Sequence, residues 1–114
     1  MPYLKIQTNQ ALDEAARQTL MKKASTTVAE QLGKPENYVM VTLQTAQNML
    51  FAGTDGPLAY LELKSIGLSE STTQALSDSL CTLMAQELDI EKNRTYIEFA
   101  DAPRHMWGWN GGTF

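Results

Sequence analysis

The chain has 114 residues, with 9 basic and 13 acidic side chains and a formal net charge of −4. This length suits one domain, residues 1–114, with a single hydrophobic core. No basic surface of the kind that nucleic acid requires is indicated, and the longest apolar run, Met49–Ala52, is far shorter than the roughly 20 residues of a membrane span. We therefore expect neither nucleic acid nor a membrane as a partner.

Cysteine and histidine are scarce, since Cys81 and His105 are the only ones. One cysteine cannot form an internal disulfide, and the N-terminus lacks a basic segment followed by an apolar one, so we expect a cytoplasmic protein. Export without a signal segment stays open. Cys81 is predicted to be a buried, inert side chain rather than a reactive thiol. Without ligands at metal spacing, no metal or other cofactor is expected.

The first half of the chain is predicted to form a strand, a helix and a second strand. Residues 3–7 alternate apolar and polar side chains, as a half-buried strand does, and residues 39–44 alternate again. Asp13 can cap the helix between them, and Gly33 ends it because glycine readily adopts the left-handed conformation. The apolar stripe of this helix is spaced by four residues and comprises Leu20, Ala24, Val28 and Leu32.

The second half repeats this order of elements. Residues 60–64 and 95–99 alternate as strands, and Ser69 or Ser71 can cap the helix between them. The spacing of the strands is nearly the same in both halves, 37 residues from Ile6 to Leu43 and 36 from Leu63 to Phe99. The apolar face of the second helix comprises Leu76, Leu80, Leu83, Met84 and Leu88.

These two units, approximately residues 2–57 and 58–114, predict an α+β fold with an internal repeat. Right-handed crossovers make the strands parallel within each unit. The expected architecture is a four-stranded sheet with two helices on one face, although the periodicity equally allows a ferredoxin-like monomer. If Ile97 and Phe99 pack on the helices, Tyr96 and Glu98 lie on the uncovered face, open to solvent or to neighbouring subunits.

The C-terminal tail, residues 106–114, combines three glycines with the aromatic residues Trp107, Trp109 and Phe114. A disordered tail rarely carries so much apolar area. It is expected either to pack on its own core or to line a pocket or an interface.

Several short segments in order along the chain form a recognisable set. They are Met1-Pro2, Gly33-Lys34-Pro35 with Tyr38, Ser65-Ile66-Gly67, Tyr96-Ile97, and Gly108-Trp109-Asn110 with Thr113-Phe114. Together they resemble the macrophage migration inhibitory factor family of the tautomerase superfamily, and the resemblance covers essentially the whole chain. It implies a homotrimer in which three sheets surround a channel, with pockets at the subunit boundaries, and a catalytic Pro2 that loss of Met1 exposes.

The resemblance also assigns roles around Pro2, whose amine would act as general acid and base. An N-terminal amine has a pKa near 8, which burial and a nearby cation lower towards neutrality. Lys34 is expected to meet the substrate carboxylate, and Ile66 to donate its backbone N–H with Ser65 beside it. Tyr96 would reach the pocket from the adjacent subunit. The expected apolar walls are Tyr3, Tyr38, Trp107, Trp109 and Phe114, with trimer packing as the alternative for the last two.

Three positions depart from the vertebrate pattern. Glu98 replaces an asparagine, and a carboxylate at the pocket rim would repel an anionic substrate and raise the pKa of Pro2, so weaker activity is predicted. Leu58–Leu61 stands where vertebrate members have Cys-x-x-Cys, so thiol–disulfide exchange should be absent. Trp107 is bulkier than the usual residue and would narrow the pocket.

The function that the resemblance predicts is cofactor-independent keto–enol tautomerisation of phenylpyruvate-like α-keto acids. A first alternative is a cytokine-like or host-mimicking ligand with incidental catalysis, whose protein receptor no sequence feature supports. A second alternative is hydration or dehalogenation of unsaturated acids, with a cationic Pro2 and with Glu98 activating water.

Overall fold

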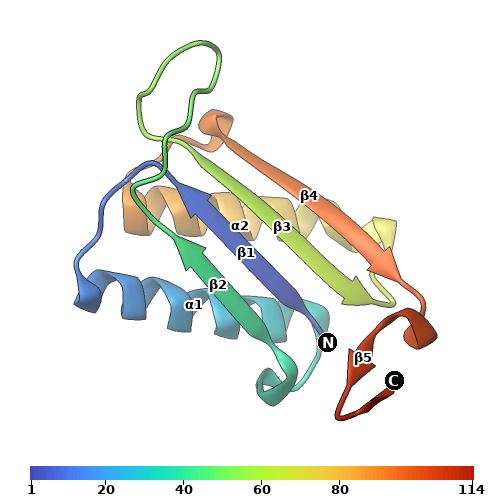
Figure 1. Ribbon diagram of the computed structural model, residues 1–114. Helices are drawn as coiled ribbons and strands as arrows, with labels where there is room; N and C mark the ends of the chain where they lie inside the picture. Colours follow the sequence, from blue (N-terminus) through green and yellow to red (C-terminus); the bar gives the residue numbers. More distant parts are fainter.

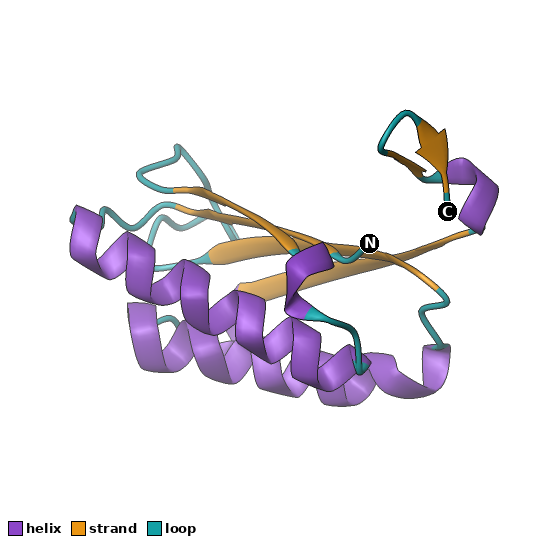
Figure 2. Cartoon of the chain, turned by 90° about the horizontal axis from the view of Figure 1, so that it is seen from below, coloured by secondary structure: helices purple, strands orange, loops and turns teal.

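Two helices cover one face of a four-stranded sheet in the computed structural model, which describes residues 1–114 (Figure 1, Figure 2). The strands are β1 (Tyr3–Thr8), β2 (Met40–Gln44), β3 (Ala59–Ile66) and β4 (Thr95–Ala102), and the helices are α1 (Glu14–Leu32) and α2 (Thr73–Leu88). The short elements are the 3₁₀ turns η1 (Glu36–Tyr38), η2 (Glu70–Thr72), η3 (Lys92–Arg94) and η4 (Arg104–Met106) and the C-terminal hairpin of β5 (Gly108–Trp109) and β6 (Gly112–Thr113).

The sheet has the strand order β2-β1-β3-β4. Strands β1 and β2 are parallel, as are β3 and β4, which confirms the predicted parallel pair within each β-α-β unit. The two units meet along an antiparallel pairing of β1 with β3, in which Leu4 lies opposite Leu63. Strands β2 and β4 are consequently the outer strands of the sheet.

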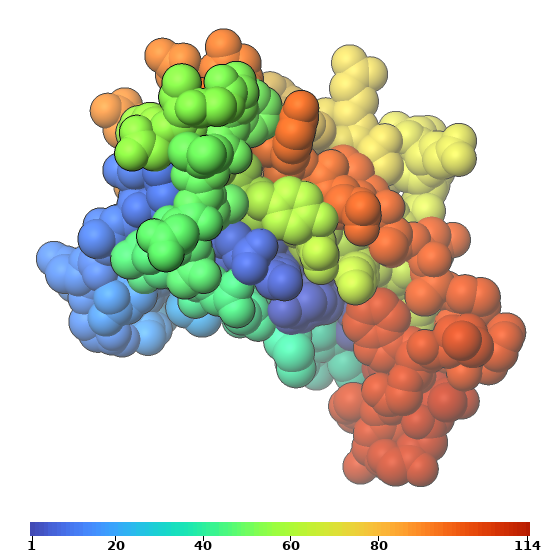
Figure 3. Space-filling view, turned by 45° about the horizontal axis from the view of Figure 1, so that its top comes forward, coloured from blue at the N-terminus to red at the C-terminus, as the bar shows by residue number.

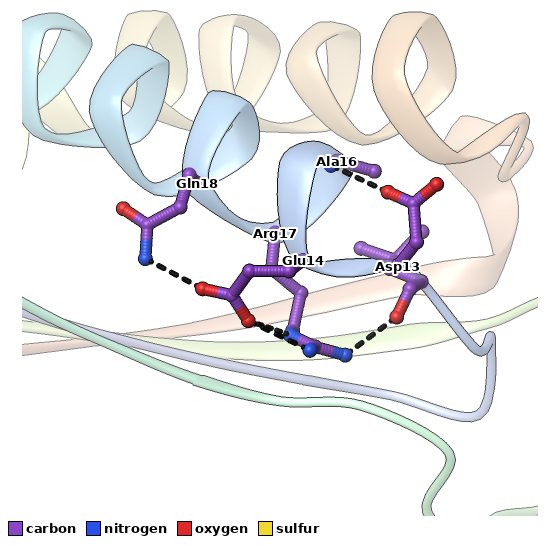
Figure 4. A network of polar contacts seen from close by, with 6 residues as sticks. Asp13, Glu14, Ala16, Arg17 and Gln18 are labelled. Atoms are coloured by element: carbon purple, nitrogen blue, oxygen red, sulfur yellow. Dashed lines mark hydrogen bonds and ion pairs between the residues drawn. The ribbon is translucent and has the colours of Figure 1, made fainter.

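The predicted caps of α1 are confirmed. The Asp13 side chain accepts a hydrogen bond of 2.8 Å from the backbone N–H of Ala16 (Figure 4), and Gly33 ends the helix with φ +62°. The cap of the second helix was predicted wrongly in detail. Ser69 accepts from the N–H of Ser71 and so caps the short turn η2, and α2 begins only after this turn.

The core lies between the helices and the sheet, and its central members are fully buried leucines and isoleucines of β1 and β3 and apolar residues of both helices. On β4, Ile97 and Phe99 pack against this core, whereas Tyr96 is 65% exposed on the other face, as predicted. Cys81 is buried within α2, and burial raises the pKa of its thiol. Neither helix combines the length and the apolar character needed to cross a bilayer.

Candidate active site

A pocket of about 590 Å³ lies where the N-terminus, the segment from η1 to β2 and the C-terminal tail meet. Figure 1 shows that the two ends of the chain lie on the same side of the molecule, beyond the C-terminal end of β3. The pocket brings together six residues that the sequence predicted for the site: Pro2, Tyr3, Tyr38, Trp107, Trp109 and Phe114.

Pro2 is fully buried and continues the line of β1. Its carbonyl accepts a 3.0 Å hydrogen bond from the N–H of Met40, which extends the parallel pairing with β2 by one residue. The amine of Met1 donates to the carbonyl of Tyr38 at 2.8 Å. Burial, and secondarily the positive charge of Lys34, lower the pKa of this N-terminal amine. Both causes shift this amine towards its neutral, basic form.

Lys34 lies just outside the pocket wall, at the end of α1. The left-handed conformation of Gly33 turns the chain there, and the N–H of Lys34 bonds back to the carbonyl of Ala29 at 3.0 Å. The Lys34 ammonium donates to the carbonyl of Ile66 at 2.9 Å and forms no ion pair with a carboxylate. Its charge is therefore uncompensated at the end of β3, where the buried Ser65 precedes Ile66.

The aromatic residues of the tail form the outer wall of the pocket. The Trp109 and Phe114 rings are stacked, with centroids 5.3 Å apart, and Tyr38 meets both edge-on, at 5.7 Å and 6.0 Å. The hairpin turn that allows this stacking runs through Asn110 and Gly111, both with positive φ. Of the two expectations for the tail, the structure favours the lining of a pocket.

Tyr96 and Glu98 do not line the pocket of their own chain. On β4, Tyr96 is level with Tyr60, and its ring lies 4.7 Å from that of Phe51. The pocket lies instead at Tyr3 on β1 and its neighbour Lys64 on β3. Along β3, Lys64 is two side chains beyond Tyr60 on the same face of the sheet. A contribution of Tyr96 or Glu98 to a pocket therefore requires a second copy of the chain, and this contribution stays a prediction.

Sequence reasoning missed part of the lining, namely Met1, Asn37, Val39, Met40, Thr42, Lys64 and Gly108. Lys64 lies in the predicted third strand, but alternation alone places it on an open face without showing that the tail folds beside it. No group of three His, Cys, Asp or Glu side chains lies close enough together to hold a metal ion. A partly buried amine, a nearby ammonium and aromatic walls suit proton transfer on an aromatic anion.

Comparison with known proteins identifies relatives of this chain that have a similar length. The family model described as macrophage migration inhibitory factor (MIF) matches residues 1–114. A macrophage migration inhibitory factor homolog of Brugia malayi is 42% identical, covering 100% of this chain and 99% of its own. The Xenopus laevis macrophage migration inhibitory factor is 32% identical with the same coverage. The crystal structure of a homologue from Prochlorococcus marinus has a TM-score of 0.92 and 43% identity, covering 98% of both chains.

Proposed function

Since the chain belongs to the macrophage migration inhibitory factor family, which has tautomerase and cytokine-like members, we propose that it is a keto–enol tautomerase of phenylpyruvate-like α-keto acids. The observation that carries this proposal is the buried Pro2, next to an amine of lowered pKa, in the wall of an aromatic pocket. The family is typically homo-oligomeric and acts on small molecules, and we propose a homotrimer here.

The proposed reaction begins after hydrolysis of the Met1–Pro2 peptide bond, which removes Met1 and leaves the nitrogen of Pro2 as a free secondary amine. The neutral nitrogen takes a proton from C3 of the keto acid, and the electron pair of the broken C–H bond forms the C2–C3 double bond. The carbonyl oxygen gains a proton from solvent and the enol is complete. Ketonisation reverses these steps, with the protonated Pro2 returning its proton to C3. A base whose pKa lies near the operating pH serves both directions.

Lys34 supports this chemistry in two ways. After burial, its charge is the second cause of the lowered pKa of the Met1 amine, and it should favour the neutral form of the Pro2 amine in the same way. An ammonium has three donors, so Lys34 can keep its bond to Ile66 and still bind a substrate carboxylate. The stacked rings of Trp109 and Phe114 offer an apolar wall for the substrate ring.

The two alternatives from the sequence have less support. The hydratase alternative depends on Glu98, which lies outside the pocket of its own chain. The cytokine-like alternative has no specific observation in its favour in this chain.

The test is ultraviolet absorbance of enol formation from phenylpyruvate, with the parent protein compared with Pro2→Gly. Removal of Met1 must be verified by mass spectrometry in both proteins. General acid–base catalysis contributes about 10²- to 10⁴-fold, so a loss of at least a hundredfold is expected in the variant. A correctly processed parent without activity, or a Pro2→Gly protein as active as the parent, would refute the proposal.

A further inference from the structure

Lys64 is the only residue with a charged side chain among those that line the pocket. The other lining side chains are apolar, aromatic or neutral. Nothing in the proposed reaction uses Lys64, because the roles of base and of carboxylate partner go to Pro2 and Lys34. An ammonium among otherwise uncharged side chains is a potential binding group for an anion.

The charge of Lys64 is only weakly compensated. Its nearest carboxylate is that of Glu62, at 3.8 Å, close to the outer limit of an ion pair. Glu62 has another partner, since it accepts a 3.1 Å hydrogen bond from the Tyr60 hydroxyl. The Lys64 side chain is 47% exposed, and an ion pair this exposed and long contributes little. The ammonium is therefore free to bind a ligand.

Lys64 and Lys34 lie on different sides of the end of the sheet. Side chains alternate along β3, so Lys64 is on the open face while the buried Ser65 is on the helix face. Lys34, by contrast, reaches the end of β3 from α1. Figure 3 shows the C-terminal tail as a red lobe beside the open face, on which β1 (blue) and β3 (yellow-green) expose side chains. Lys34 is therefore a cation near the N-terminal amine, and Lys64 is a second cation in the wall of the pocket.

We propose that Lys64 binds a second anionic group of the substrate, so that the pocket prefers aromatic α-keto acids with a carboxylate on the ring. This inference rests on the proposed function. The α-carboxylate faces Lys34, the ring lies against the tail aromatics, and the ring carboxylate accepts from the Lys64 ammonium. Lys64 is then a determinant of specificity rather than of the proton transfer itself.

The test compares kcat/KM for 4-carboxyphenylpyruvate with kcat/KM for phenylpyruvate. In the parent the ratio is expected to exceed one, and in Lys64→Gln it should fall about tenfold, because a charge-assisted hydrogen bond at a half-exposed site is lost. Lys64→Arg should retain most of the preference. Lys5→Gln is the matched control, because it removes an equal charge from the same face outside the pocket, and it should leave the ratio within twofold. The preference should also weaken as salt is raised.

A binding measurement separates this inference from the proposed function. Calorimetric titration of the two acids into Pro2→Gly protein, with and without Lys64→Gln, reports the preference without catalysis. Tighter binding of 4-carboxyphenylpyruvate that disappears with Lys64→Gln supports the inference, even if the parent is no tautomerase. Equal binding of the two acids overturns it. So does an equal loss for both acids in Lys64→Gln, which would mean that Lys64 binds the α-carboxylate instead.

Discussion

Arg94 holds the loop between β2 and β3 against the start of β4, so its replacement should destabilise the fold. Its guanidinium donates to the carbonyls of Pro57 at 3.0 Å, Thr54 and Gly56 at 3.2 Å each, and Phe51 at 3.3 Å. It also lies 5.4 Å from the centre of the Phe51 ring. Arg94→Met keeps the aliphatic stem and removes all of these interactions.

The expected loss of unfolding free energy is about 2 kcal/mol. Four partly exposed hydrogen bonds contribute about 0.5 kcal/mol each, at the low end of the usual range. The contact with Phe51 adds about 0.5–1 kcal/mol, and the released side chain recovers a comparable amount of rotamer entropy. Because Phe51 packs on Tyr96, the variant should also loosen a residue predicted to serve a neighbouring pocket.

Urea denaturation at one fixed protein concentration measures this effect, since the stability of an oligomer depends on concentration. Lys92→Met is the matched control: it lies in the same turn, η3, and removes only an exposed ion pair with Asp78, so a change below about 0.5 kcal/mol is expected. If Arg94→Met were as stable as this control, the guanidinium would not be what holds the loop, and the reasoning would be refuted.

Three further predictions concern titration and reactivity. The kcat/KM for phenylpyruvate should rise with pH as the Pro2 amine loses its proton. Burial, and secondarily Lys34, lower the pKa of the Met1 amine at this end of the chain, so Lys34→Gln should move the rise to higher pH. An unmoved profile would contradict the role of Lys34. Glu98→Asn should raise kcat/KM several-fold if a neighbouring copy places Glu98 at the pocket rim, and a variant no faster than the parent argues against that placement. Burial raises the pKa of the Cys81 thiol, so alkylation at pH 8 should be at least tenfold slower in the folded protein than in urea, and equal rates would mean that the thiol is accessible.

Local patterns in the sequence were sufficient to predict the two β-α-β units. Alternation located β1 to β4, and Gly33 and Asp13 marked the ends of α1, because each of these signals acts within a few residues. The error at the start of α2 has the same origin. Ser69 has the side chain of a cap, but the helical turn that it caps is the short η2, which has no buried residue and in which the Thr72 hydroxyl also donates to the Ser69 carbonyl.

The pocket depends on long-range geometry and could be predicted only in part. Family resemblance supplied Pro2 and the tail aromatics, whereas periodicity gave no sign that Lys64 and the tail come together. The antiparallel pairing of β1 with β3, which brings Lys64 level with Tyr3, is likewise invisible to a pattern that repeats every two residues. Contacts between residues so far apart in the sequence can be predicted only when the topology of the sheet is known.

Met1 and Phe114 both border the pocket, and this has a practical consequence for anyone who handles the protein. A purification tag at the N-terminus would prevent release of the Pro2 amine, and a tag at the C-terminus would follow directly on a residue of the aromatic wall. Either would make an active protein look inert. The exposed loop between β2 and β3 lies at the other end of the sheet in Figure 1, so a label there stays clear of this chain's own pocket. Gly53 itself should be kept, because its φ of +76° strains any added side chain.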